Sequence, residues 1–309
     1  MLVDLHAHTT ASDGSLSPIE LLERAKARGI EMLSITDHDT LAAYDVLEKT
    51  GLTGLRLIPG IEFSGRWRNA EVHILGLNID TGNSLLKETV ARQKQARVVR
   101  AEIISTKLRR LGIAHSLAEI QESAGTKILG RPHFARYLAE KGHCKTVAAA
   151  FKKYLGPGKP GNDCSMWAPM SELIPSIHAA GGKAVLAHPM KYGFTHRRMN
   201  ELISEFMANG GEGIEVISGS QSPERSLMLS RICAQYGLEA SCGSDFHTPD
   251  QPWTDLGRIN ALPASCLPVW HNWQAEGKNQ SDYRSAPLFP GGMVRALNPP
   301  PDPLREVRS

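Results

Sequence analysis

The chain has 309 residues, of which 41% are hydrophobic and 6% aromatic. This is enough apolar material for one large α/β domain, or for one domain with an insertion. No apolar run in the sequence reaches the roughly 18 residues of a membrane span, and the first residues lack the basic region of a signal peptide. The five cysteines form no CxxC pair. We therefore expect a reduced, cytoplasmic protein without membrane association and with no evident protein partner.

The formal net charge of +3 conceals an uneven distribution. Residues 81–165 contain sixteen Lys and Arg but six Asp and Glu, a net charge of +10, whereas the rest of the chain carries −7. A basic segment beside an acidic body is typical of a surface that binds polyanions. A solvated helical hairpin rich in Lys and Arg explains the charge equally well.

Strands and helices are expected to alternate over residues 1–80. Strands are expected over residues 2–5, 32–35, 56–62 and 71–77. The first helix is expected to begin after Ser17, an N-cap residue followed by proline, and to end at Gly29. A second helix is expected over residues 40–49.

A helical pattern replaces this alternation after Asp80. Helices are expected over residues 85–111, 116–123, 132–141 and 146–154, and no strand is expected before Lys183. Alternation then resumes, with strands over 184–187, 213–216 and 239–242 and helices over 197–208 and 223–236. Repeated strand–helix units imply a parallel sheet closed into a barrel. We therefore expect a discontinuous α/β barrel (residues 1–80 and 166–275), a basic helical insertion that forms a cap (81–165) and a flexible, proline-rich tail (276–309).

Nine side chains that can bind a metal ion occur in short polar motifs, most of them where an expected strand ends. The motifs include Asp4-Leu5-His6-Ala7-His8, Thr36-Asp37-His38-Asp39-Thr40 and Gly243-Ser244-Asp245-Phe246-His247. The nine residues are His6, His8, Asp13, His38, Glu62, His73, His188, Asp245 and His247. Barrel folds build active sites at the carboxyl ends of their strands, so we expect these side chains to meet at one mouth of the barrel.

Six imidazoles and three carboxylates exceed the needs of a single ion. They suit two or three divalent cations that share a bridging carboxylate, for which Glu62 is the candidate. A ligand set without thiolate favours Mn, Fe, Zn or Co, and among these we expect manganese. The flanking Asp4, Asp37 and Asp39 are interpreted as groups that orient imidazoles, or as caps.

These motifs resemble those of the PHP (polymerase and histidinol phosphatase) family. The resemblance runs from Asp4 to Trp273 and includes His73–Asp80 and Gly182–Pro189. It implies a distorted (βα)7 barrel with a trinuclear metal site. It is strongest to a bacterial subfamily that acts on 3′,5′-nucleoside bisphosphates and on 5′-phosphorylated RNA.

The resemblance also implies which residues share an ion. One ion would take His6, His8, Glu62 and Asp245. A second would take Glu62, His73 and His188, and a third would take Asp13, His38 and His247. Catalytic roles are implied for Glu62, Asp245, His247 and His38.

The segment Gly130–Arg136 resembles the insertion of the same subfamily and supplies candidate substrate-binding residues. Arg131 can fork onto a phosphate, and His133 can donate a further hydrogen bond. Lys191 and Tyr192, which follow the His188 motif, are weaker candidates. The stretch Asn162–Ser165 departs from the more aromatic and proline-rich sequence expected there, so the edge of the pocket is expected to differ.

We therefore predict a metal-dependent phosphoesterase in which a metal-activated water attacks phosphorus. Its substrate partner would be a 3′,5′-nucleoside bisphosphate, which loses its 3′-phosphate, or a short 5′-phosphorylated RNA degraded in the 5′→3′ direction. A histidinol-phosphate-type phosphatase is the enzymatic alternative, but its small substrate does not explain the +10 insertion. A non-catalytic metal-binding module is the alternative of another class, and the complete set of nine ligands argues against it.

Overall fold

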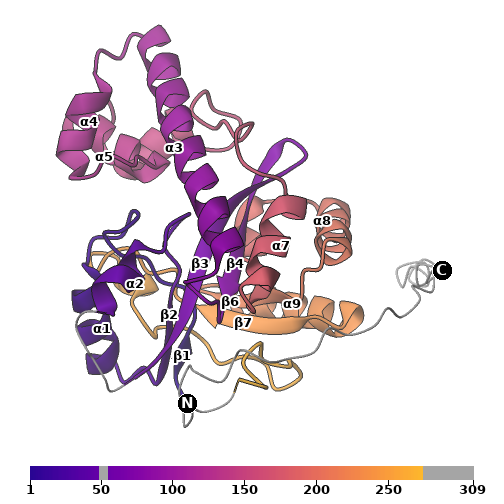
Figure 1. Ribbon diagram of the computed structural model, residues 1–309. Helices are drawn as coiled ribbons and strands as arrows, with labels where there is room; N and C mark the ends of the chain where they lie inside the picture. The colour runs from indigo at the N-terminus through magenta and orange to yellow at the C-terminus, as the bar shows by residue number, and fades with distance from the viewer. Residues whose placement is uncertain (49–54, 274–309) are drawn as a thin grey trace. The chain divides into compact units, whose positions relative to one another are not determined.

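Seven strands lie side by side in chain order and curve into a nearly closed barrel (Figure 1). A computed structural model describes residues 1–48 and 55–273 of the chain. The strands are β1 (Val3–Asp4), β2 (Met32–Ile35), β3 (Arg56–Trp67), β4 (Ala70–Leu77), β5 (Lys183–Leu186), β6 (Gly213–Ser218) and β7 (Glu239–Gly243). The predicted α/β barrel is confirmed, and residues Met1–His271 form one compact unit. The predicted tail over residues 276–309 lies outside the described residues.

The expectation of a wholly parallel sheet is wrong at β4, which runs antiparallel to both β3 and β5. Only Arg68 and Asn69 separate β3 from β4, and Trp67 pairs with Ala70 across this turn. A two-residue connection can join antiparallel strands, whereas a parallel pair needs a crossover of a dozen or more residues. The sequence predicts no helix between these two strands, and this absence was the available signal of an antiparallel pair.

The barrel closes where the segments that follow its first and last strands meet. The backbone N–H of Leu5 donates to the carbonyl of Cys242 at 2.9 Å, and the N–H of Asp245 donates to the carbonyl of His6 at 2.9 Å. Because parallel neighbours bring their carboxyl ends to the same edge, this seam places residues from both ends of the described chain at one mouth of the barrel.

Helices cover the outside of the barrel as the sequence predicted, with one addition. The helices are α1 (Pro18–Ala27), α2 (Ala42–Leu47), α7 (Met170–Ala179), α8 (His196–Ala208) and α9 (Pro223–Tyr236). Helix α1 begins at Ser17 in a capping box with Glu20, which satisfies its first free N–H groups. Helix α7 was not predicted, because Pro175 lies inside it and proline usually marks the end of a helical pattern.

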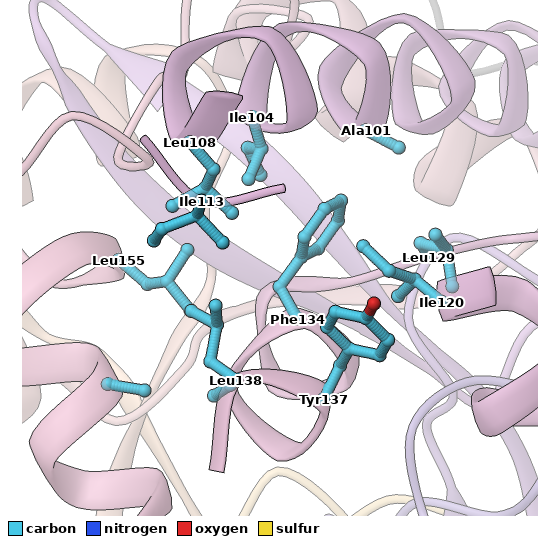
Figure 2. Packing of buried hydrophobic residues seen from close by; sticks show 12 residues of the cluster. Ala101, Ile104, Leu108, Ile113, Ile120, Leu129, Phe134, Tyr137, Leu138 and Leu155 are labelled. Carbon is cyan, nitrogen blue, oxygen red and sulfur yellow. The ribbon is translucent and has the colours of Figure 1, made fainter. Parts of the chain in front are cut away.

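The insertion is helical, as predicted. It consists of α3 (Ser84–Arg110), α4 (Leu117–Ala124), α5 (Arg131–Glu140), α6 (Val147–Ala150) and a π-helix, η1 (Phe151–Leu155). Its helices share a hydrophobic cluster in which Phe134 of α5 points toward Ala101 and Ile104 of α3 (Figure 2). None of the described helices combines the length and the apolarity needed to cross a membrane. The division of the chain into barrel and cap stays a prediction.

Polar side chains in the first half of α3 contact the barrel. Gln93 donates to the carbonyl of Ser64 and to the carboxylate of Asp39, which lies 3.1 Å away. Arg97 donates from Nε to Asp39 at 2.6 Å and from Nη2 to the Ser64 hydroxyl at 2.8 Å. Because these groups are buried, each hydrogen bond fixes α3 against the barrel mouth.

Candidate metal centre

All nine side chains that the sequence indicates as ligands lie in one cluster at the barrel mouth. Each belongs to at least one group of three or four residues whose ligand atoms lie within 4.8 Å of one another. The groups are His8, Asp13, His38 and His247; His6, Glu62 and His188; His6, His8 and Asp245; and His38, Glu62 and His73. The structure thus brings together residues from almost the whole length of the described chain.

The strand ends explain this convergence. His6 and His8 follow β1 two residues apart, so both side chains point to the same side, and their Nε2 atoms lie 3.2 Å apart. His38 follows β2, His188 follows β5 and Asp245 follows β7. His73 differs because it lies within β4, where it pairs with Ser64 of β3.

Glu62 of β3 occupies the middle of the cluster and is fully buried. Its Oε1 atom lies 2.8 Å from Nδ1 of His73 and 2.9 Å from Nε2 of His188. Its Oε2 atom faces three further ring nitrogens, those of His6 at 3.2 Å, His8 at 3.2 Å and His38 at 3.1 Å. Burial alone would raise the pKa of Glu62, but the neighbouring imidazoles hold it well below its usual range.

Several buried atoms of this cluster lack hydrogen-bond partners among the described residues. They are Oε2 of Glu62 and Nδ1 of His8, His38 and His188. Oε2 of Glu62 lies close to Nδ1 of His38 but is not aligned for a hydrogen bond. Buried polar atoms are rarely left unpaired, because each unpaired atom costs about 1–3 kcal/mol. The orphaned atoms and the all-nitrogen-and-oxygen donor set therefore fit divalent cations.

The grouping of these side chains differs in part from the ion sets that the family resemblance implies. His8 lies with Asp13 and His247 as well as with His6 and Asp245. His38 likewise lies within two groups, one of which contains Glu62. The cluster is therefore continuous, and the assignment of each ligand to one ion stays a prediction.

Backbone strain is concentrated at the same place. Of the non-glycine residues with positive φ in the described part of the chain, His188 (27°), Asp245 (53°) and Asp39 (54°) lie in or beside the cluster. Such conformations cost about 1–3 kcal/mol each and persist where the surroundings fix them. The Ser64 N–H, for example, donates to Asp39 at 2.8 Å.

Glu215 of β6 is a contributor that the sequence analysis missed. Its Oε1 atom lies 3.0 Å from Nδ1 of His6, and its Oε2 accepts the backbone N–H of His188 at 2.6 Å. Its side chain is fully buried. A carboxylate that accepts the second ring N–H of a ligating histidine fixes the ring and its tautomer. The available signal was an acidic residue in the middle of the apolar strand Gly213–Ser218.

The three aspartates that flank ligands accept hydrogen bonds from groups other than imidazoles: Asp4 and Asp37 from the ligand loops, and Asp39 from β3 and α3. Asp4 accepts the backbone N–H of Ser244 at 2.8 Å, and Asp37 accepts both the N–H and the hydroxyl of Thr9, at 2.7 and 2.6 Å. Across the described ranges, neither these two carboxylates nor Asp39 accepts a hydrogen bond from an imidazole ring. Their interpretation as orienting groups is therefore corrected, because these acceptors are used by backbone and side-chain donors of the ligand loops and, for Asp39, of β3 and α3.

His133 and Arg131, the candidate substrate-binding pair, lie at the start of α5 but face different partners. Nδ1 of His133 accepts the backbone N–H of Gly130 at 2.9 Å, and burial lowers the pKa of this imidazole to about 4. Arg131 donates to Asn162 at 2.6 Å and pairs with Glu71 at 2.7 Å. Asn162 belongs to the stretch that departs from the expected sequence, so this departure gives Arg131 a partner at the edge of the site.

Lys191 and Tyr192 both lie beside the cluster, on the short helix η2 (Pro189–Tyr192). The Lys191 ammonium pairs with the carboxylate of Asp245. The Tyr192 hydroxyl accepts the backbone N–H of His73 at 2.8 Å and donates to the carbonyl of Ala187 at 2.8 Å. This hydroxyl therefore links β4 to the end of β5, and the substrate-binding role of both residues stays a prediction.

A cavity of about 140 Å³ lies between the cluster and the insertion. The barrel contributes Asp13 and His38 to its wall, and the insertion contributes Lys94, Arg97 and His133. Metal-binding side chains therefore face basic side chains across a space that can hold an anionic group. Sequence reasoning did not single out Lys94, because a lysine on a basic helix carries no local signal of a site.

An α/β barrel with this cluster at its mouth is the architecture of a hydrolase with a metal centre. The family model of the PHP domain matches residues 4–149. The chain is 42% identical over 278 residues to the 5′-3′ exoribonuclease Rnm of Escherichia coli (strain K12), covering 89% of this chain and 94% of the relative. It is 37% identical to the 3′,5′-nucleoside bisphosphate phosphatase of Chromobacterium violaceum, covering 88% and 96%.

The solved structures agree with these relatives. A structure of an amidohydrolase from Chromobacterium violaceum, with bound sulfate and no metal, matches with a TM-score of 0.81 at 36% identity. The match covers 87% of this chain and 95% of that one. The chain belongs to the PHP family.

Proposed function

We propose that the protein is a phosphoesterase that removes the 3′-phosphate from 3′,5′-nucleoside bisphosphates, giving the 5′-nucleotide, and that hydrolyses 5′-phosphorylated RNA in the 5′→3′ direction. The observation that carries the proposal is the cluster of nine metal-binding side chains that opens onto a cavity with a basic wall. The names of the two relatives described above support the choice of substrates.

We infer that the nine side chains hold two or three divalent ions, manganese first, with zinc, iron and cobalt as alternatives. When bound, such ions lower the pKa of water and stabilise the charge on phosphate oxygens. Glu62 contributes by presenting both carboxylate oxygens to different imidazoles, so it fits the position of a shared ligand. Glu215 holds the His6 ring and the His188 backbone and so keeps the ligand geometry fixed.

The exposure of the ligands indicates where substrate meets the cluster. The side chain of His247 is 29% exposed, whereas those of His6, His8 and Glu62 are fully buried. His38 and Asp13 line the cavity itself. We infer that the phosphate to be hydrolysed approaches the cluster from the side of His247 and His38. Asp245 lies between these two residues and His6. The imidazole of His133 can donate a hydrogen bond from the opposite wall.

A turnover assay with three substrates tests this proposal. Protein loaded with manganese is given adenosine 3′,5′-bisphosphate, a 5′-phosphorylated RNA oligonucleotide and histidinol phosphate, and released phosphate and nucleotides are quantified. We expect the first two substrates to be hydrolysed with kcat/KM at least about tenfold above that for histidinol phosphate. A preference for histidinol phosphate supports the alternative phosphatase, and metal binding without hydrolysis of any of the three supports a non-catalytic module.

The cysteines fit the expected cellular compartment. All five are free thiols, and Cys233 and Cys242 are buried. Disulfides are rare where glutathione keeps thiols reduced, so we infer a cytoplasmic location, which fractionation of cells that produce the protein would test.

A further inference from the structure

A basic segment without any acidic residue follows His188 of the metal centre. Residues 189–200, which form η2 and the start of α8, contain no aspartate or glutamate, although the chain outside the insertion carries a net charge of −7. The basic residues of the segment are Lys191, His196, Arg197 and Arg198. Tyr192 and Phe194 lie among them. Positive charge interleaved with aromatic rings is typical of surfaces that bind single-stranded nucleic acid.

Aromatic rings connect this segment to the metal centre. The ring of His188 lies 5.7 Å from that of Tyr192, and the ring of Tyr192 lies 5.5 Å from that of Phe194, measured between ring centres. Phe194 lies in turn 5.6 Å from Trp67 at the end of β3. Trp67 is buried, whereas Tyr192 and Phe194 are partly exposed. The two partly exposed rings therefore form a continuous surface from the metal centre to the start of α8.

The exposed edge of the metal centre reaches the same segment. Nδ1 of His247 lies 3.6 Å from Oδ1 of Asp245, and Asp245 pairs with the ammonium of Lys191, whose side chain is 52% exposed. The insertion forms a wall of the cavity beside Asp13 and His38. A polymer that continues beyond the reacting phosphate therefore has an exposed route over Lys191 toward the start of α8.

Arg198 is a guanidinium that this surface holds in place. Its Cζ atom lies 4.2 Å from the centre of the Phe194 ring and 5.5 Å from that of Trp67. Its Nη2 atom donates to the side-chain oxygen of Asn69 at 3.2 Å, and within residues 1–48 and 55–273 no carboxylate pairs with it. An arginine stacked on an aromatic ring can still bind a phosphate through its edge. Arg198 is therefore a fixed positive charge without a counter-ion.

The two neighbouring arginines differ from Arg198 in their partners. Arg68 pairs with both Glu201 and Glu205 of α8, so its charge is compensated. In the described part of the chain Arg197 pairs with Glu201 alone, at 3.1 Å, and its side chain is 91% exposed. Exposed pairs of this kind contribute little to stability. Arg197 can therefore turn from Glu201 to a phosphate at low cost.

We propose that Tyr192, Phe194 and Arg198 bind the part of an RNA substrate that lies 3′ of the scissile bond. Bases pack on the exposed parts of the two rings, which accept any base, and Arg198 holds a backbone phosphate irrespective of sequence. The inference rests on the proposed function, because it adds a downstream strand to the hydrolysis of RNA at the metal centre. A nucleoside bisphosphate has no nucleotide beyond the reacting phosphate, so this surface favours RNA over the free nucleotide.

The test compares two RNAs that share their 5′ end and scissile bond and differ in length. Manganese-loaded protein is assayed with a 5′-phosphorylated dinucleotide and with a 5′-phosphorylated RNA of about ten nucleotides. The length preference is the ratio of the two kcat/KM values for release of the first nucleotide, and we expect the wild type to prefer the longer RNA. Arg198→Ala should lower this preference by about tenfold, mainly through KM, the low end for one charge-assisted hydrogen bond because the guanidinium is partly exposed.

Two further measurements do not depend on how well Arg198→Ala packs. Arg197→Glu reverses a charge on an exposed side chain and should also lower the length preference. The kcat/KM of the wild type for the longer RNA should fall with salt, because each phosphate contact releases counterions. Loss of the Arg198 contact should make the log–log slope shallower by about 0.7.

Arg231 supplies a matched control. It is an exposed arginine on α9, outside residues 189–200. Arg231→Ala and Arg231→Glu should therefore leave both the length preference and the salt dependence unchanged.

The outcomes separate the inference from the proposed function. If the wild type hydrolyses both RNAs with equal kcat/KM, or if Arg198→Ala keeps the wild-type length preference, the inference is overturned and the function stands. The same holds if Arg198→Ala lowers kcat/KM equally for both RNAs, or if Arg231→Glu acts as strongly as Arg197→Glu. Should Arg198→Ala fail to fold, an unchanged length preference in Arg197→Glu overturns the inference. A wild type that hydrolyses neither RNA overturns it together with the proposed hydrolysis of RNA.

Discussion

Glu215 offers a direct test of how the metal centre is held, through the variant Glu215→Gln. The glutamate accepts two hydrogen bonds, one from the His6 ring and one from the His188 backbone. Glutamine has the same shape, but only one of its two terminal atoms is an acceptor, and the other is an NH₂ donor. In either orientation one of the two contacts is therefore lost.

The size of the effect follows from which contact is lost. If the NH₂ group faces His188, a buried backbone N–H stays unpaired and the free energy of unfolding falls by about 1–3 kcal/mol. If it faces His6, the ring must place its proton on Nε2, the atom that lies beside Glu62 and Asp245, and that nitrogen can no longer bind an ion. Loss of such an orienting carboxylate typically lowers metal affinity by about 10- to 100-fold.

Two measurements check this prediction. Metal content is determined by elemental analysis after equilibration at a series of buffered free manganese concentrations, and the free energy of unfolding is measured in denaturant with chelator present. Glu224→Gln, an exposed glutamate on α9, is the control and should match the wild type in both. A Glu215→Gln protein with wild-type manganese affinity and wild-type stability would refute the role of Glu215.

The remaining predictions concern other parts of the site. Elemental analysis of protein never exposed to chelator should find two to three divalent ions per chain, and an active metal-free protein would contradict the metal centre. Glu62→Ala should lower kcat more than His133→Ala, because Glu62 contacts several ligands whereas His133 should mainly affect KM; equal kcat losses with unchanged KM would count against this. Arg131→Ala removes one of the two arginines that hold Glu71, which lies 3.6 Å from Nε2 of His73, so it should impair bisphosphate and monophosphate hydrolysis alike; a loss confined to the bisphosphate would instead support direct phosphate binding by Arg131. Burial lowers the pKa of His133 from 6.5 to about 4, so its contribution to stability is full above pH 6.5 and is lost as the pH falls toward 4. Denaturation of His133→Gln should show a shallower loss of stability across this window, and an unchanged slope would contradict it.

Local sequence signals were sufficient to predict most of the helices and strands. Ser17 and Gly29 correctly marked the ends of α1, because a capping side chain and a glycine with positive φ act within a few residues. The ligand motifs also had local signals, since most of them lie just after a short apolar strand, with Glu62 and His73 inside β3 and β4 as the exceptions. The convergence of these strand ends followed from the barrel that the strand–helix alternation implied.

The parts that could not be predicted depend on contacts between distant segments. Arg131 pairs with Glu71 across the interface of insertion and barrel, and no periodicity in either segment indicates this partner. Glu215 likewise acquires its role only from the His6 ring and the His188 backbone that lie opposite it. The expected parallel sheet was wrong at β4 for a simpler reason: the connection from β3 is only two residues long, which permits only an antiparallel pair.

The seam of the barrel has a consequence for protein synthesis. His6 and His8 are synthesised well before Asp245 and His247, and backbone hydrogen bonds join the two sides. Contacts of such large sequence separation form late and slowly. No nascent chain or proteolytic fragment that ends before Asp245 can assemble the centre. A growing chain that has not reached Asp245 and His247 therefore lacks a complete set of ligands, and the same late segment that closes the barrel also completes the centre.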